Sequence, residues 1–466
     1  MMLLLYLCSL RTLLLLLLTL ASVGHAKQQC RLVLQSNFNG NGEGDPQVPL
    51  SATPTSSGST ASASATLAPF NYGKDIIRGV NLGGWFVLEP WITLSIFEDT
   101  NNSDIIDEYT FGQLQDSEHA LSILQDHWET WITEDDFAAI NAAGLNHVRM
   151  QIGYWSVPIA STDTNYTTSV DPYIPGAWPY LLQALGWAKK HGIHVILDLH
   201  GAPGSQNGYD NSGQRGSANW AQGSNVARTL DIVRFIADQI GGMIDVLELL
   251  NEPGGYQADI AAVIADYWQD GYNVVRNVSG PSLKVMIGDA FLGVASWDGF
   301  LTSPDAQGVL MDYHEYQIFN YDQLEMSQDE HLNYSCSVLS TLRSYAKSNL
   351  YTVSGEWSNA ITDCAKWLNG RGVGARWDGT WQDGQPTFGS CDGYTGDSSS
   401  FSDDYKTFLR KYFESQIAIG EAVQGWIFWT WKAENADDWS YQKGLEGGWI
   451  PKDPTDRLYP NICSDS

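Results

Sequence analysis

The hydrophobic positions of this chain fall into eight short runs that alternate with longer amphipathic segments. Each run is nearly continuous in apolar residues, which is typical of strands buried on both faces of a parallel sheet. The runs are RGVNL, HVRMQI, HVILDLH, VLELLNEP, KVMIGDA, GVLMDYHEY, YTVSGEW and GWIFWTW, starting at Arg78, His147, His194, Val246, Lys284, Gly308, Tyr351 and Gly425. Segments between them, such as WPYLLQALGWAKKHG and NVARTLDIVRFIADQIGG, have helical patterns. The alternation predicts an α/β fold, a single (β/α)8 TIM barrel.

An open, doubly wound sheet is the structural alternative, and periodicity alone does not exclude it. No Gly-x-Gly-x-x-Gly follows the first run, and nearly every run ends in a polar or aromatic residue. A barrel collects its chemistry at the carboxyl ends of its strands, so this placement favours the barrel.

The N-terminal part of the chain differs in composition from the rest. Residues 1–26 are typical of a signal peptide, with an apolar run from Leu13 to Val23 before small residues. This run is short for a bilayer span, and a retained signal anchor is the alternative. Residues 27–69 end in a Ser/Thr/Ala-rich segment without large apolar side chains, which predicts a linker or pro-segment. We expect the catalytic domain over 70–466.

Charge and composition narrow the class of partner. The chain has 54 acidic and 25 basic residues, a net charge of −29, which disfavours nucleic acid and a stable association with anionic membranes. Its 43% hydrophobic and 17% charged residues suit a globular protein with a large core. Most of the 19 Trp and 22 Tyr would fill that core, but flat aromatic rings also stack on sugars. A neutral carbohydrate fits this balance.

Cysteines and sequons agree with secretion to the cell exterior or the cell wall. Cys8 lies in the predicted signal peptide and Cys30 in the polar segment after it. Four cysteines remain, which allow two disulfides in three possible pairings: Cys336, Cys364, Cys391 and Cys463. Their spacing lacks Cys-x-x-Cys, so no zinc site is indicated. Candidate glycosylation sites are Asn101, Asn165, Asn277 and Asn333.

Two glutamates stand at the ends of apolar runs. Glu252 lies in Asn251-Glu252-Pro253 after VLELL, and Glu356 ends YTVSGE before Trp357. Two carboxylates at strand ends of one barrel can face each other across its mouth, as glycoside hydrolysis requires. One must keep a proton near the working pH while the other stays ionised for attack on the anomeric carbon. For most other acidic residues, a solvated or ion-paired side chain is the simpler interpretation.

The chain resembles family 5 of the glycoside hydrolases and, within it, the fungal exo-β-1,3-glucanases. The resemblance spans roughly Asp75 to Cys463 and rests on RGVNLGGWFVLEPWI, LDLHGAPGSQNGYDNSG, LLNEP and GWIFWTWKAEN. These segments together are specific, whereas Asn-Glu-Pro alone marks the wider clan. The resemblance implies a retaining glucan 1,3-β-glucosidase with Glu252 as acid/base and Glu356 as nucleophile.

Supporting roles also follow from the resemblance. Arg149 would hold Glu356 ionised, Tyr316 would donate a hydrogen bond to Glu356, and Asn251 would bind the sugar 2-hydroxyl. His314 precedes Tyr316 in the family's His-x-Tyr. The implied sugar contacts are Glu89, His200, Tyr209, Phe319 and Trp429. A structural ion pair is the alternative for Arg149, and a satisfied core position is the alternative for the histidines.

Two further expectations come from the resemblance. Tyr209 stands where the family has one of two phenylalanines that clamp the next glucose unit at the entrance, so stacking is retained in kind but the affinity for longer polymer is in question. The implied disulfides are Cys336–Cys463 and Cys364–Cys391.

We therefore expect a secreted monomer that releases glucose from the non-reducing ends of β-1,3-glucan or its oligosaccharides, with retention, an acidic optimum, and neither cofactor nor metal. Transfer to another sugar would use the same covalent intermediate. A related β-glucosidase or an endo-glucanase would differ mainly in the loops around Tyr209 and Glu89. A non-hydrolytic glucan-binding wall protein would be expected to lack a catalytic carboxylate, and both are present. The full polar set also disfavours an extracellular scaffold.

Overall fold

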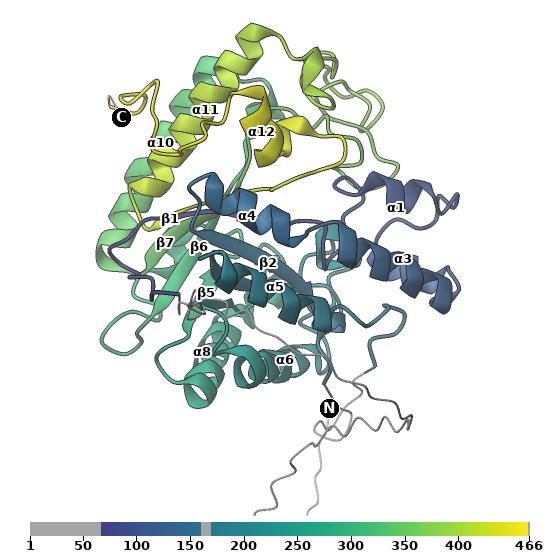
Figure 1. The fold of residues 1–466 in the computed structure, drawn as a ribbon, viewed down its shortest axis with the longest axis vertical. Helices are drawn as coiled ribbons and strands as arrows, with labels where there is room; N and C mark the ends of the chain where they lie inside the picture. The colour runs from purple at the N-terminus through teal and green to yellow at the C-terminus, as the bar shows by residue number, and fades with distance from the viewer. Residues whose placement is uncertain (1–66, 160–168, 465–466) are drawn as a thin grey trace, which may run out of the picture. The chain divides into compact units, whose positions relative to one another are not determined.

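The structure is a computed structural model that describes residues 67–159 and 169–464 (Figure 1). The predicted signal peptide, most of the predicted linker, both N-terminal cysteines and the sequon at Asn165 lie outside the described residues. No helix within these two ranges has the length and hydrophobicity of a membrane span.

Parallel strands form a closed barrel in which each strand pairs with the next one in the sequence. They are β1 (Ile77–Asn81), β2 (His147–Gly153), β3 (His194–Gly201), β4 (Val246–Glu248), β5 (Lys284–Gly288), β6 (Val309–Glu315), β7 (Tyr351–Trp357) and β8 (Gly425–Phe428). Closure is made by β8 pairing with β1, with Gly425 beside Ile77. The predicted (β/α)8 barrel is confirmed, and the doubly wound alternative is excluded.

Helices cover the outside of this barrel (Figure 1). They are α1 (Leu94–Glu98), α2 (Glu108–Gln113), α3 (Ser117–Thr130), α4 (Glu134–Ala142), α5 (Trp178–Lys190), α6 (Asn225–Ile240), α7 (Ala258–Ala261), α8 (Ile264–Ser279), α9 (Tyr321–Leu324), α10 (Gln328–Ser348), α11 (Asp403–Glu421) and α12 (Tyr441–Gly447). The amphipathic segments that precede β3 and β4 become α5 and α6, as predicted. Figure 1 shows α10 packed beside α11 and α6 beside α8.

The fourth strand is shorter than its apolar run predicts, because β4 ends at Glu248. Leu249 and Leu250 remain buried beyond it. The Leu249 N–H still donates to the Met286 carbonyl at 3.0 Å, and the Leu249 carbonyl accepts a hydrogen bond from the Tyr267 hydroxyl at 2.7 Å. The backbone therefore leaves the ladder with its polar groups satisfied, and the following residues enter the barrel mouth.

The inside of the barrel changes from apolar to polar along its axis. Near the amino ends of the strands it is filled by a fully buried apolar cluster: Ile77, Ile196, Val246, Met286, Leu310, Val353 and Ile427. Two residues further along β3, β4 and β6 stand Asp198, Glu248 and Asp312, which are also buried. The lower half supplies packing, and the upper half supplies a polar floor for the carboxyl face.

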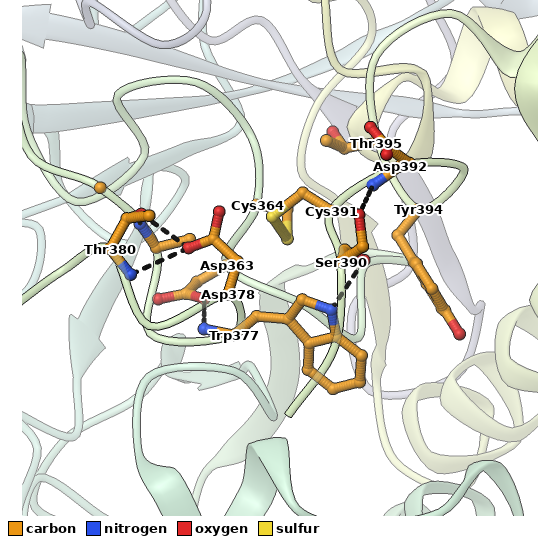
Figure 2. Close-up of a disulfide and its surroundings, with 12 residues drawn as sticks. Asp363, Cys364, Trp377, Asp378, Thr380, Ser390, Cys391, Asp392, Tyr394 and Thr395 are labelled. Carbon is orange, nitrogen blue, oxygen red and sulfur yellow. Dashed lines mark hydrogen bonds between the residues drawn. A yellow bond between two sulfur atoms is a disulfide. The ribbon is translucent and has the colours of Figure 1, made fainter. Parts of the chain in front are cut away.

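Both disulfides form with the pairing that the resemblance implies. Cys336–Cys463 ties α10 to the C-terminal segment, and Cys364–Cys391 closes the loop that follows β7. Figure 2 shows the second bridge beside Trp377, whose indole N–H donates to the Ser390 carbonyl at 3.0 Å. The sequon residues within the described ranges are exposed, which leaves their glycosylation a prediction: Asn101, Asn277 and Asn333.

Candidate active site

A cavity of about 810 Å³ opens at the carboxyl ends of the strands. It is lined by residues from the loop after each strand except β2, and by residues of β3, β4, β5, β6 and β7. Of the side chains predicted for the site, all but Arg149 and Asn251 line this cavity, and these two lie buried beside it. The structure thus brings together residues that are scattered over more than half of the sequence.

Glu252 reaches the cavity from the loop after β4. Its backbone has a φ of 43°, a left-handed conformation that is costly for a residue with a side chain. Asn207 donates to the Glu252 carbonyl at 3.2 Å, and Asn211 donates to its carboxylate at 3.1 Å. The surrounding loop therefore holds Glu252 in a strained backbone conformation, which fixes the direction of its carboxyl group.

Glu356 reaches the same cavity from β7 through a shift in strand register. Tyr313 pairs with Ser354, but His314 pairs with Glu356, so Gly355 is an extra residue on β7. Such a bulge turns the next side chain toward the barrel interior. A Cβ atom on Gly355 would lie 1.9 Å from the Asp312 carboxylate, so only glycine fits here.

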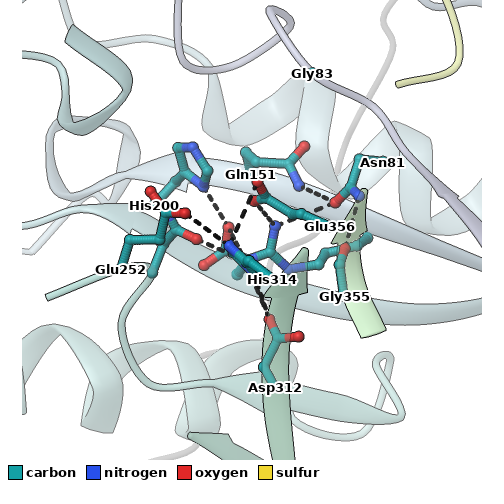
Figure 3. A network of polar contacts seen from close by, with 12 residues as sticks. Asn81, Gly83, Gln151, His200, Glu252, Asp312, His314, Gly355 and Glu356 are labelled. Carbon is teal, nitrogen blue, oxygen red and sulfur yellow. Dashed lines mark hydrogen bonds and ion pairs between the residues drawn. The ribbon is translucent and has the colours of Figure 1, made fainter. Parts of the chain in front are cut away.

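The two glutamates face each other across His314 (Figure 3). His314 Nδ1 lies 2.7 Å from Glu252 Oε1 and 3.5 Å from Glu356 Oε2. One oxygen of each carboxyl group and one nitrogen of His314 lie within 4.8 Å of one another. Arg149 Nη1 donates to Glu356 Oε1 at 2.8 Å, and the Tyr316 hydroxyl donates to Glu356 Oε2 at 3.0 Å. Glu356 thus receives two donors that favour its ionised form.

Arg149 is the centre of a buried charge network. Its Nε and Nη2 donate to the two oxygens of Glu248 at 2.7 and 3.0 Å, and Nη2 also donates to Asn251 at 2.8 Å. Asp198 lies 3.1 Å and Asp312 3.7 Å from Nη2. Each guanidinium nitrogen has a hydrogen-bond partner, so the orientation of the guanidinium plane is fixed. In this orientation Nη1 points to Glu356, the nucleophile candidate.

Electrostatics couples the three groups at the cavity floor. Burial raises the pKa of Glu356, against the charges of His314 and Arg149. Burial also acts to raise the pKa of Glu252, but the hydrogen bond from His314 holds it below its ordinary value. Burial disfavours the charged form of His314, yet Glu356 and Asp312 raise its pKa well above the ordinary value. A change at His314 therefore alters the protonation of both carboxyl groups.

Groups suited to sugar hydroxyls surround this floor. Glu89 is buried, accepts from the Trp91 indole N–H at 2.9 Å, and has a pKa raised by burial and by Asp210. His200 Nδ1 lies 2.6 Å from Asp198 Oδ2, and the buried Nε2 of His200 has no hydrogen-bond partner among residues 67–159 and 169–464. The ring of His200 stacks on Trp429 with centroids 5.6 Å apart.

Asn251 lies beside the acid/base candidate with half of its amide unused. Its oxygen accepts from Arg149, and its buried nitrogen has no partner in the described part of the chain. A buried unpaired donor is costly unless a ligand satisfies it. The amide N–H groups of Asn251 are thus available to a substrate hydroxyl.

The two predicted clamp residues lie at the mouth. Tyr209 is 49% and Phe319 is 45% exposed, and both line the cavity. The Phe319 ring packs edge-on against Tyr316 with centroids 5.7 Å apart. A hydrogen bond of 3.0 Å joins the hydroxyl of Tyr209 to that of Tyr256.

Several cavity residues could not be identified from the sequence. Asp210 and Asn211 follow Tyr209 in the segment LDLHGAPGSQNGYDNSG, but Asp and Asn are also ordinary turn formers, so nothing in the sequence distinguishes these two as site residues. Arg376 and Trp381 lie in the disulfide-closed loop, where the guanidinium sits 3.9 Å from the indole centroid. That loop has no periodicity from which a position could be inferred.

Glu252, His314 and Glu356 have the composition of a possible divalent metal site. Their atoms already hydrogen-bond one another, and the Arg149 guanidinium 2.8 Å from Glu356 supplies positive charge where a cation would sit. The geometry suits acid–base and nucleophilic chemistry better than metal binding. Absence of a cofactor stays a prediction.

Comparison with known proteins identifies relatives of this chain. The family described as cellulase (glycosyl hydrolase family 5) matches residues 106–369. A glucan 1,3-beta-glucosidase of Blumeria graminis is 43% identical over 404 residues, covering 85% of this chain and 92% of that protein. Glucan 1,3-beta-glucosidase 2 of Wickerhamomyces anomalus is 44% identical over 409 residues, covering 84% and 92%.

Solved structures agree at the level of the fold. The rutinosidase from Aspergillus niger superposes with a TM-score of 0.63 and 18% identity, covering 82% of this chain and 100% of that structure. With the barrel, the glutamate pair and the sequence matches taken together, the chain belongs to glycoside hydrolase family 5.

Proposed function

We propose that this enzyme is a retaining exo-β-1,3-glucanase that releases glucose from the non-reducing ends of β-1,3-glucan. The observation that carries the mechanism is the pairing of Glu252 and Glu356, with carboxylate oxygens within 4.8 Å of each other. Retaining glycosidases hold their carboxyl groups about 5–5.5 Å apart, and inverting ones about 6.5–9.5 Å apart to admit a water. The names of the relatives support the substrate class.

In the first step, a Glu356 oxygen attacks the anomeric carbon while the glycosidic bond breaks. Glu252 gives its proton to the departing oxygen. Arg149 and Tyr316 continue to donate hydrogen bonds to Glu356, which keeps its carboxyl group ionised until the covalent bond forms. Asn251 Nδ2, which is buried and has no partner within the described residues, donates to the 2-hydroxyl, a contact that strengthens in the transition state.

In the second step, Glu252 takes a proton from a water as that water attacks the anomeric carbon. The bond to Glu356 breaks, β-glucose leaves, and both carboxyl groups return to their first states. A second sugar in place of water gives transglycosylation through the same intermediate. The cavity lining by Glu89, His200 and Trp429 supports a pocket for one terminal glucose unit.

The pKa directions in the free protein are the reverse of those that the first step needs. The hydrogen bond from His314 lowers the pKa of Glu252, whereas burial raises the pKa of Glu356. We propose that substrate reverses this order, because a bound sugar shields Glu252 from water and offers the glycosidic oxygen as an acceptor for its proton. The pH profiles of kcat/KM and of kcat should therefore differ.

Secretion to the cell exterior or wall remains part of the proposal, supported by the leader-like N-terminus, the two disulfides and the exposed sequons. A monomeric state, and the lack of a nucleic acid or membrane partner, stay predictions from charge and composition.

The test is the product profile from laminarin, with the anomeric configuration of the first product read by NMR. We expect β-glucose alone at early times, lost in both Glu356→Gln and Glu252→Gln. Glu118→Gln, on the exposed first turn of α3, is the matched control and should retain activity. Mixed oligosaccharides at early times would indicate an endo-glucanase, and α-glucose as the first product would exclude retention. If no β-glucan were cleaved, the protein would instead be a glucan-binding protein.

A further inference from the structure

Glu108, the first residue of α2, is a buried carboxyl group that the proposed reaction does not use. It is 2% exposed and does not line the cavity. Its Oε2 accepts the Leu88 N–H at 2.8 Å, and its Oε1 accepts the Trp155 indole N–H at 2.7 Å. A buried carboxyl group is costly unless its oxygens are paired, and here the two oxygens are matched to two donors from different loops.

The first donor fixes the backbone beside Glu89. Leu88 directly precedes Glu89 in the loop after β1. On the other side, the Glu89 carbonyl accepts from the N–H groups of Ile92 at 3.0 Å and Thr93 at 3.2 Å. From this anchored backbone the side chain of Glu89 reaches the cavity and lines its wall. Glu108 is therefore the side chain that holds the N-terminal side of the loop carrying Glu89.

The second donor belongs to a ring that packs against the loop after β3. Cβ atoms on Gly153, Gly201 and Gly213 would lie 2.3, 2.7 and 2.2 Å from the Trp155 ring, so only glycine fits at these positions. Gly213 belongs to that loop, whereas the other two glycines end β2 and β3. The ring also stacks on Tyr173 with centroids 4.0 Å apart. These contacts leave the indole one position, so its N–H is a fixed point of attachment for the carboxyl group.

The residues on either side of this glutamate bind the same loop. The Asp107 carboxylate accepts from the Arg215 N–H at 2.7 Å, and the Tyr109 N–H donates to the Gly213 carbonyl at 2.9 Å. The loop after β3 also carries Asn211, which donates to the carboxylate of the acid/base candidate at 3.1 Å. The start of α2 thus joins the loop of a predicted sugar contact to the loop that holds the acid/base candidate.

We infer that Glu108 is a positioning residue for substrate recognition, which keeps Glu89 at a fixed place relative to Asn211 and the acid/base group so that one glucose unit fits between them. This inference rests on the proposed function, in which Glu89 lines the pocket for the terminal glucose. Two acceptor oxygens are required at this position, because both neighbouring groups donate. A glutamine would replace one oxygen by an NH2 group, which would face an N–H donor and displace one of the two loops.

The experiment measures kcat/KM on 4-nitrophenyl β-glucoside and on its 3-, 4- and 6-deoxy analogues. The ratio of parent to analogue, here called the deoxy ratio, reports how much each hydroxyl contributes to transition-state binding. Glu89→Gln identifies the hydroxyl bound by Glu89 as the one whose deoxy ratio falls. Glu108→Gln should lower the same deoxy ratio by about three- to ten-fold and leave the others unchanged, because a displaced Glu89 loses its hydrogen bond. The variant with both substitutions should show no further fall.

Glu414→Gln is the matched control. Glu414 is also buried and accepts from the N–H groups of Leu458 at 2.8 Å and Tyr459 at 2.7 Å, but it does not line the cavity. Its replacement should lower the thermal unfolding temperature without changing any deoxy ratio. If Glu108→Gln does not fold, Trp155→Phe answers the same question, since it removes one donor and keeps an aromatic ring; the same deoxy ratio should then fall by a smaller factor.

Unchanged deoxy ratios in the variant that folds, or an equal fall in all of them, would mean that Glu108 serves only the stability of the fold, and would overturn the inference. Unchanged ratios in Glu89→Gln would also overturn it, because Glu89 would then bind no hydroxyl. If the wild type cleaves the nitrophenyl glucoside but not laminarin, the proposed function fails while the deoxy ratios still decide the inference. Cleavage of neither substrate would overturn both.

Discussion

Arg149 donates to Glu356 with one edge of its guanidinium while its other edge forms a two-point ion pair with Glu248. Both partners are buried, so the orientation of the guanidinium is set by the barrel interior and not by solvent. The carboxylate proposed to attack the sugar is thereby tied to a charge network on four other strands, β2, β3, β4 and β6.

Replacing Arg149 tests this arrangement. A lysine supplies one point charge and cannot keep the contacts to Glu248, Asn251 and Glu356 together. We expect Arg149→Lys to lower the free energy of unfolding by about 3–5 kcal/mol, as for a broken buried ion pair, and kcat by about 100-fold or more. Urea unfolding and steady-state kinetics measure the two effects. Full activity in the variant would contradict the role proposed for Arg149.

The pH profile should move when His314 is replaced. Its hydrogen bond lowers the pKa of Glu252, and its charge opposes the rise in the pKa of Glu356 caused by burial. In His314→Gln both carboxyl pKa values should therefore increase. The two limbs of the kcat/KM profile report the ionisations of this coupled pair in the free enzyme, so both limbs should shift to higher pH. The control is His119→Gln, at an exposed position of α3; a profile that narrows or moves to lower pH would contradict the coupling.

The leaving group should reveal the acid role of Glu252. A dinitrophenolate is stable enough to leave as an anion, whereas the glycosidic oxygen of a departing sugar must be protonated as it leaves. We expect Glu252→Gln to lower the first-step rate by about 100-fold or more on laminaribiose and far less on 2,4-dinitrophenyl β-glucoside. Burst kinetics on the activated substrate would show accumulation of the covalent intermediate, because its hydrolysis still needs the base. Equal losses on both substrates would reject Glu252 as the acid.

The two disulfides should differ in their effect on catalysis. Removal of either bridge, as a double Cys→Ser variant, should cost about 2–5 kcal/mol of stability. Only Cys364–Cys391 closes the loop that carries Arg376 and Trp381 to the cavity, so only its loss should raise KM for glucan. Cys336–Cys463 is the matched control because it closes a different segment. Thermal unfolding and KM, measured below both unfolding transitions, separate the two effects.

The barrel and the proximity of the two proposed catalytic glutamates could be predicted from the sequence, because both depend on periodicity. Continuous apolar runs specify buried parallel strands, and their carboxyl ends must meet at one face, which brings Glu252 toward Glu356. The identities of the supporting residues came from the resemblance and not from periodicity.

Other features leave little trace in the sequence. The bulge at Gly355 shifts the register by one residue inside YTVSGEW without changing its apolar character. A signal was present for the charge network, since Asp198, Glu248 and Asp312 each interrupt an apolar run. Asp198 and Glu248 are paired across β3 and β4. An acidic residue within a buried strand requires a buried partner, and Arg149 was the cation available on a neighbouring strand.

Ring closure of the barrel also has a consequence for biosynthesis. Asn81 on β1 donates to the carbonyl of Gly355 at 2.9 Å and to that of Phe428 at 3.3 Å, and it accepts from Arg149. The floor of the site thus joins the first described strand to the last two, which are made more than 270 residues later. A growing polypeptide on the ribosome therefore has no working site until β7 and β8 have emerged, and premature termination before them yields an inert product instead of a weaker enzyme.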